Sequence, residues 1–194
     1  MRKFFLFLSL MLLGACGDSG LPSPYHAIEV SWQHPKADFQ LADFDGKLRR
    51  LSDFRGKVVV LFFGYTHCPE VCPTTLADLA QVMRQLGEDA ARVQVVFVTL
   101  DPERDTPALL AKYVTSFDPS FLGLYGDAQA TALTAKSFGV NYEKQFDKQG
   151  SYTLDHTDGI YMIGVRGKPL LIAPYGQRSE LLVKDIRSLL TIGR

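Results

Sequence analysis

The stretch that decides the fold is Val58-Val59-Val60-Leu61-Phe62-Phe63-Gly64-Tyr65-Thr66-His67-Cys68-Pro69-Glu70-Val71-Cys72-Pro73. Its first six residues are β-branched, aliphatic or aromatic without a break, a pattern typical of a strand that is buried on both faces. Beyond Pro73, apolar residues recur every three or four positions as far as Leu86, and Gly87 follows. This spacing predicts an amphipathic helix with a proline in its opening turn. The two cysteines therefore lie between a buried strand and the start of a helix.

Strand and helix patterns alternate along the rest of the chain. Strands are predicted at 93–98, 152–156, 160–163 and 170–172, helices at 108–117, 128–138 and 180–190, and a hairpin at 39–46. This order predicts an α/β protein with a mixed central sheet and helices on both faces. Because the cysteines follow the first central strand, the order resembles a thioredoxin-like fold.

The first residues read as an export signal. Arg2 and Lys3 precede an apolar run at 4–13, which is too short to span a bilayer because that needs about 20 residues. The run ends at Leu13-Gly14-Ala15-Cys16, which resembles the bacterial lipobox, in which the cysteine is acylated. An uncleaved anchor helix and a secreted soluble protein are the alternatives.

On this interpretation the chain has three parts. Residues 1–15 are a lipoprotein signal peptide, 16–35 a tether lipidated at Cys16, and 36–194 the folded domain. The tether is rich in Gly, Pro and Ser, and its histidines, His26 and His34, are expected to be merely solvated. The protein is then expected in the bacterial cell envelope, held at a membrane by its lipid anchor and facing the periplasm or the cell exterior.

Charge and cysteine content narrow the function. The 194 residues include 21 basic and 21 acidic side chains, so the balance gives no support for nucleic-acid binding. Of the three cysteines, lipidation of Cys16 leaves only Cys68 and Cys72 in the exported domain. In an oxidising compartment such a pair is a disulfide, a dithiol or a set of metal ligands.

The position of the pair at a helix start has chemical consequences. Free backbone N–H groups and the helix dipole favour thiolates there, so we expect lowered thiol pKa values. Thiolates are soft ligands that suit Cu(I). A structural disulfide between Cys68 and Cys72 remains an alternative, although so short a loop gains little chain entropy from closure.

Three sequence blocks together resemble the SCO/SenC family. They are the stretch at 64–73 quoted above, Thr99-Leu100-Asp101-Pro102-Glu103-Arg104-Asp105-Thr106-Pro107, and Asp155-His156-Thr157 with Tyr161. The resemblance implies a thioredoxin-like domain that binds one copper ion through Cys68, Cys72 and His156. It also implies a role in assembling the copper centre of cytochrome c oxidase, with the copper-bearing subunit or another copper protein as partner.

The chemistry of these ligands fits copper in both oxidation states. Two thiolates satisfy Cu(I), and the imidazole of His156 adds a harder nitrogen that helps to hold Cu(II). His67 is the competing histidine and is expected to tune the thiols instead of joining them. Asp155 is a candidate to orient the imidazole through a hydrogen bond, and the alternative is that this neighbouring strand residue simply faces solvent. The 101–107 block is interpreted as scaffold near the site.

Two functions remain open, so whether the protein is an enzyme is undecided. The first is a copper metallochaperone. The second is a thiol–disulfide reductase of exported or apo-oxidase cysteines, with Cys68 and Cys72 as the redox pair. A peroxidase is a distant third, because the residues before Cys68 do not form a peroxidatic motif. The chain also departs from the family at Gly164-Val165-Arg166-Gly167, where Asp-Pro and a glycine turn are usual.

Overall fold

The computed structural model describes residues 23–30, 33 and 37–192. The predicted signal peptide, the lipidation site Cys16 and the tether histidine His34 lie outside the described residues. No helix within the described ranges is both long enough and apolar enough to cross a membrane.

An eight-stranded mixed sheet forms the centre of the protein, with the strand order β1-β10-β9-β4-β5-β6-β2-β3. Its three central strands β4, β5 and β6 run parallel, and the remaining neighbours pair antiparallel. The strands are β1 (Ile28–Glu29), β2 (Gln40–Asp43), β3 (Leu48–Arg50), β4 (Val58–Gly64), β5 (Val93–Thr99), β6 (Leu122–Tyr125), β9 (Ile160–Ile163) and β10 (Pro169–Ala173).

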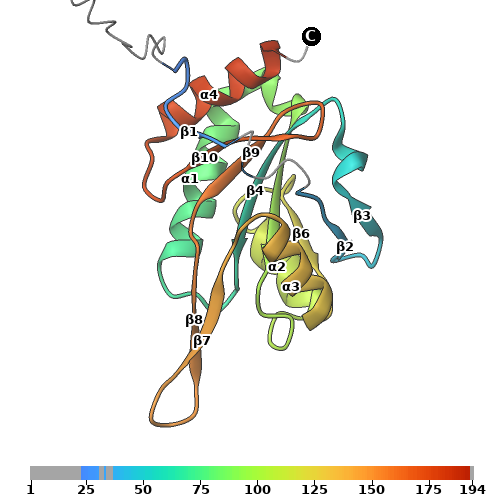
Figure 1. The fold of residues 1–194 in the computed structure, drawn as a ribbon, viewed down its shortest axis with the longest axis vertical. Coiled ribbons are helices and arrows are strands. Elements are labelled where there is room, and N and C mark those ends of the chain that lie inside the picture. Colours follow the sequence, from blue (N-terminus) through green and yellow to red (C-terminus); the bar gives the residue numbers. More distant parts are fainter. Residues whose placement is uncertain (1–22, 31–32, 34–36, 193–194) are drawn as a thin grey trace, which may run out of the picture.

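Helices cover both faces of this sheet, as the sequence predicts (Figure 1). Helices α1 and α4 pack together on one face, and α2 and α3 lie on the other. The helices are α1 (Val71–Leu86), α2 (Pro107–Thr115), α3 (Ala128–Ser137) and α4 (Ser179–Ile192), with short 3-10 turns η1 (Leu51–Phe54) and η2 (Gly87–Arg92). The mixed α/β architecture is therefore confirmed.

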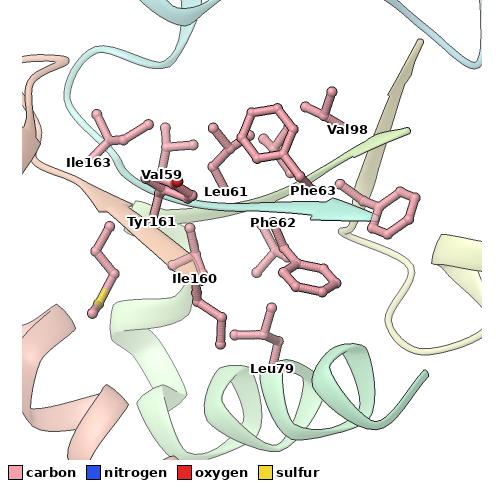
Figure 2. Packing of buried hydrophobic residues seen from close by; sticks show 14 of the residues in the cluster. Val59, Leu61, Phe62, Phe63, Leu79, Val98, Ile160, Tyr161 and Ile163 are labelled. Carbon is pink, nitrogen blue, oxygen red and sulfur yellow. The ribbon is translucent and has the colours of Figure 1, made fainter. Parts of the chain in front are cut away.

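Every residue of β4 is buried. Because successive side chains point to opposite faces, the strand contributes apolar side chains to the core on both sides of the sheet. Figure 2 shows Val59, Leu61 and Phe63 on one side of the strand, while Phe62 points to the helix that carries Leu79. On the other face, the Phe63 ring packs against Phe138 at the end of α3, with centroids 5.6 Å apart. Apolar packing on both faces fixes where β4 ends, and hence where the cysteine turn begins.

A separate two-stranded hairpin carries the histidine candidate. Strands β7 (Tyr142–Phe146) and β8 (Tyr152–His156) pair only with each other among the described strands. The hairpin projects beyond the main sheet (Figure 1). The sequence patterns predict β8 but miss β7, whose residues are mostly polar.

The start of the folded unit differs from the prediction. Strand β1 lies inside the segment predicted as tether, and it pairs with β10. The backbone N–H groups of His26 and Ala27 donate to the carboxylate of Asp185 on α4, at 2.9 and 2.8 Å. The His26 ring nitrogen Nδ1 also lies 3.1 Å from Asp185. His26 is therefore a fixed contact of the fold, and the expectation that it is merely solvated is wrong.

Candidate functional site

The two cysteines lie at the carboxyl end of β4, in different environments. Cys72 is fully buried in the first turn of α1, whereas Cys68 is half-buried in the turn before the helix. Both are free thiols. The backbone N–H of Cys72 donates to the sulfur of Cys68 at 3.3 Å. The helix start thus places one of its free N–H groups on the more exposed sulfur, as an N-cap side chain would.

Gly64 allows the buried sulfur to lie against the end of β4. A Cβ atom at this position would be 2.7 Å from the Cys72 sulfur and 2.9 Å from the Phe97 ring. Neither group has room to withdraw, because both are fully buried. The glycine at the end of the strand is therefore required by the close approach of the thiol.

The expectation of a lowered thiol pKa is wrong for Cys72. Burial, the largest cause, raises the pKa of this thiol far above its ordinary value, and the nearby Cys68 and Asp105 add to the increase. A backbone hydrogen bond at Tyr65 lowers the pKa but is outweighed. Removing water from around the sulfur destabilises the thiolate more than the helix N-terminus stabilises it, so Cys72 is a neutral thiol at pH 7.

His156, at the end of β8, turns its imidazole toward this sulfur. Its Nδ1 lies 2.9 Å from the carbonyl oxygen of Thr157, and its Nε2 lies 4.0 Å from the sulfur of Cys72. Because a carbonyl only accepts hydrogen bonds, Nδ1 carries the proton and the lone pair of Nε2 faces the thiol. The rings of Tyr65 and Phe62 flank the imidazole edge-on, with centroids 6.1 and 6.5 Å away.

The Thr157 carbonyl takes the orienting role that the sequence assigned to Asp155. The side chain of Asp155 is exposed and makes no hydrogen bond to His156 within the described structure. Neighbouring strand residues point to opposite faces, so Asp155 points away when His156 points inward. Of the two interpretations of Asp155, the structure agrees with the one in which it faces solvent, and the orienting hydrogen bond is accepted by the Thr157 carbonyl instead.

The donors come close together without yet enclosing an ion. A metal that binds sulfur at about 2.3 Å and imidazole nitrogen at about 2.0 Å, as zinc does, separates the two donors by roughly 3.7 Å at a trigonal angle. The 4.0 Å separation of Cys72 and His156 is near that value. Among the described residues, no three His, Cys, Asp or Glu side chains are arranged to hold a metal as they stand. Cys68, Cys72 and His156 would have to move closer to share one ion.

A cleft of about 430 Å³ gives access to the site. Cys68 and His156 line it together with Tyr65 and Leu154, whereas Cys72 is not part of its wall. The rim is acidic, and its carboxylates belong to Glu70, Asp155 and Asp158.

Asp105 fixes the turn that carries Cys68. Its buried carboxylate accepts hydrogen bonds from the backbone N–H and the hydroxyl of Thr66, at 3.0 and 2.6 Å, and from the hydroxyl of Thr99 at 2.6 Å. His67 is exposed, and its Nδ1 lies 3.6 Å from the same carboxylate. His67 therefore contacts Asp105 and forms no hydrogen bond with either thiol among the described residues, so the expectation that it tunes the thiols stays a prediction.

Arg104 fixes the hairpin that carries His156. Its Nη1 donates to the Tyr152 carbonyl at 2.8 Å, and its guanidinium stacks 3.6 Å above the Tyr152 ring. The Asp101 carboxylate accepts hydrogen bonds from both residues, from Nε of Arg104 and from the hydroxyl of Tyr152, the second at 2.8 Å. The 101–107 segment, interpreted from the sequence as scaffold, therefore holds both halves of the site. Sequence reasoning missed Tyr152, for which the only signal is an aromatic residue four positions before His156.

A SCO1/SenC family model matches residues 31–191 of this chain. The chain belongs to the SCO1/SenC family. This SCO1/SenC chain is 44% identical over 135 residues to the mitochondrial SCO2 homolog of Bos taurus, an alignment that covers 68% of the chain and 51% of the relative. The chain spans about half to three-fifths of the length of the curated mammalian relatives that it matches.

Solved structures of SCO1/SenC proteins share the fold. The structure of Bradyrhizobium japonicum ScoI with copper bound is 40% identical, with a TM-score of 0.73, covering 78% of this chain and 97% of that one. The solution structure of apo Sco1 from Thermus thermophilus is 41% identical, with a TM-score of 0.72, covering 79% and 90%. The thioredoxin-like fold predicted from the sequence is confirmed by this likeness.

Proposed function

We propose that this protein binds one copper ion through the thiolates of Cys68 and Cys72 and the Nε2 atom of His156. The observation that carries the proposal is the 4.0 Å approach of Nε2 to the buried sulfur, with Nδ1 tied to a carbonyl. Two soft sulfurs suit Cu(I), and the nitrogen extends the set to Cu(II). Copper in the related ScoI structure supports the assignment.

The different exposure of the ligands suits a carrier that must give its metal away. Cys68 and His156 face the cleft, where a recipient can reach them, while Cys72 is buried behind them. Binding copper displaces the proton of the Cys72 thiol, since only the thiolate is a metal ligand. We propose that the recipient is a copper protein, chiefly the subunit of cytochrome c oxidase that bears the dinuclear centre.

Copper titration of the reduced protein tests the ligand set. The wild type should bind one copper ion and show a Cu(II)–thiolate absorption band. His156→Ala should lower Cu(II) affinity on the order of 100-fold, which corresponds to about 2.7 kcal/mol. His67→Ala is the matched control, because it removes a nearby imidazole that points to Asp105. Equal Cu(II) affinities for the two variants would refute the role of His156.

A second candidate function, thiol–disulfide reduction, is favoured by the free and half-exposed thiol of Cys68, which accepts the Cys72 N–H. The Cys68 thiolate would attack a substrate disulfide and form a mixed disulfide, releasing one substrate thiolate. The departing substrate thiolate would take up the proton of the Cys72 thiol, and the Cys72 thiolate would then attack Cys68, leaving a Cys68–Cys72 disulfide and releasing the second substrate thiolate, so that two electrons pass to the substrate. His156→Ala should leave this activity unchanged, whereas Cys68→Ser should abolish it.

We further propose that Cys16 is acylated and holds the domain at a membrane of the bacterial cell envelope. The small residues before Cys16 and the short apolar run support this assignment. Mass spectrometry of the N-terminal peptide from a bacterial membrane fraction tests it. The expected result is a diacylglyceryl modification on Cys16, and an unmodified cysteine in a membrane-free fraction would refute the assignment.

A further inference from the structure

Four basic side chains gather at the end of the sheet far from the cysteines. They come from two loops joined by a hydrogen bond from the Gly56 N–H to the Val165 carbonyl, at 2.9 Å. All four are exposed, and none forms an ion pair within the part of the chain that the structure describes. This basic pole consists of Arg55, Lys57, Arg166 and Lys168.

The basic pole and the candidate site are at opposite ends of β4. Lys57 immediately precedes the strand and Gly64 ends it, so the seven residues of β4 separate them by about 20 Å. Arg166 and Lys168 lie in the turn between β9 and β10, beside the start of β4 (Figure 1).

Charge is therefore unevenly distributed in a chain whose basic and acidic residues balance. The rim of the cleft carries Glu70, Asp155 and Asp158, all exposed. The two ends of the molecule thus have opposite charges. A negatively charged surface would attract the basic pole and repel the rim of the cleft, so that both forces turn the molecule the same way.

The described chain begins at the end of the molecule opposite the β7–β8 hairpin (Figure 1), although β1 runs toward the basic pole, so that Ile28 lies farther along β10 from Lys168 than Val30 does. Asp185 on α4 holds the backbone at His26 and Ala27, and Figure 1 shows this segment, α4 and the β9–β10 turn at one end of the molecule, away from the β7–β8 hairpin. Cys16 precedes Ser23, the first described residue, by seven positions. Seven residues span at most about 25 Å however they run. A lipid on Cys16 would therefore keep this end of the domain close to the bilayer.

We propose that the basic pole rests on the anionic headgroups of the membrane that holds the acylated Cys16, so that the cleft faces away from the bilayer. The inference rests on the proposed acylation of Cys16. An anionic bilayer attracts lysine and arginine side chains that lie within about one Debye length of it, which is about 8 Å at physiological salt. The short tether allows the basic pole to come that close. Arg166 lies within the segment Gly164-Val165-Arg166-Gly167, where the chain departs from the usual family pattern.

Lysine reactivity in vesicles tests the contact. The full-length acylated protein is reconstituted into vesicles of phosphatidylcholine, with and without phosphatidylglycerol, and acetylated with a membrane-impermeant reagent. With the anionic lipid, acetylation of Lys57 and Lys168 should slow by about threefold or more and recover in high salt, because the attraction is screened. Lys148 in the hairpin turn and Lys136 on α3 are internal controls, and their reactivity should not change.

Charge reversal gives a second measurement. Arg55→Glu with Arg166→Glu should restore the acetylation of Lys57 and Lys168 to its rate in neutral vesicles, whereas Lys136→Glu should not. Flotation with neutral vesicles reports the anchor separately. Protein that floats but shows equal lysine reactivity in both lipids would overturn the proposed contact alone, and would direct the basic pole to an acidic protein partner instead. Protein that does not float would overturn the anchor, and the contact with it.

Discussion

Asp105 and Thr66 are joined by two hydrogen bonds, although 39 residues separate them in the sequence. The Asp105 carboxylate accepts hydrogen bonds from both the backbone N–H and the hydroxyl of Thr66, which lies two positions before Cys68. The position of the exposed thiol therefore depends on a buried charge in another loop, and this dependence can be measured.

Asp105→Asn should weaken both the fold and the site. The amide keeps one acceptor oxygen but loses the negative charge that strengthens all three hydrogen bonds, and its N–H group forces the Thr66 hydroxyl to change from donor to acceptor. We expect a loss of about 2–3 kcal/mol in the free energy of unfolding, measured in urea, and weaker copper binding. Asp45→Asn, in an exposed turn, is the matched control. Identical stability and copper affinity for the two variants would contradict the role given to Asp105.

Gly64→Ala should disturb the thiol directly. The added methyl group would overlap the Cys72 sulfur, and such overpacking typically costs about 1–3 kcal/mol. We expect a shifted Cu(II)–thiolate absorption band as well as lower stability. Gly164→Ala provides the comparison, because its Cβ would meet Leu170 at the same 2.7 Å distance, far from the thiols. A band that shifts equally in both variants, or in neither, would argue against the close approach at Gly64.

The raised pKa of Cys72 predicts a loss of stability in alkali. An unfolded cysteine loses its proton above about pH 8.5, while the buried thiol keeps its own, so the folded state binds more protons and its stability falls as pH rises. The contribution of the protonated Cys72 thiol to the free energy of unfolding is fully present below that pH. Between about pH 9 and 10, before tyrosines titrate, the slope from Cys72 approaches 1.4 kcal/mol per pH unit. Urea unfolding of the metal-free protein measures it, and Cys72→Ala should remove that part of the slope.

Arg104→Met should loosen the hairpin while leaving the cysteine turn in place. The substitution keeps much of the length of the side chain but removes the bond to the Tyr152 carbonyl and the charge over its ring. Hydrogen exchange of β7 and β8 should accelerate, and Cu(II) affinity should fall more than Cu(I) affinity, because only His156 lies on the hairpin. Arg178→Met, which breaks an exposed pair with Glu180, should do neither. Unchanged exchange in Arg104→Met would show that strand pairing alone holds the hairpin.

Local pattern was enough to predict the elements around the cysteines. The unbroken apolar run of β4 and the periodic face of α1 are signals within one segment, and each element is as predicted. Strand β7 was missed because Glu143, Lys144 and Gln145 do not alternate with apolar residues, and a two-stranded hairpin does not demand that they do. Strand β6 was missed because it is short and contains Gly123.

The site was harder to predict from the sequence than the fold, because it depends on contacts between distant segments of the chain. The approach of His156 to Cys72 spans 84 positions, so only the family pattern pointed to that histidine. The pKa of Cys72 was predicted in the wrong direction for a related reason. The dipole of a helix can be expected from the sequence, but complete burial of the sulfur depends on packing from β4 and β5.

The placement of His156 outside the main sheet has a consequence for protein engineering. Of the proposed ligands, Cys72 belongs to the packed core and Cys68 packs against it, whereas the third sits on a hairpin whose strands pair with no other described strand. Residue 156 is half-buried, so a methionine or a cysteine can replace the histidine there with little repacking. Metal preference could then be selected by exchanging one side chain, in a scaffold whose stability resides elsewhere.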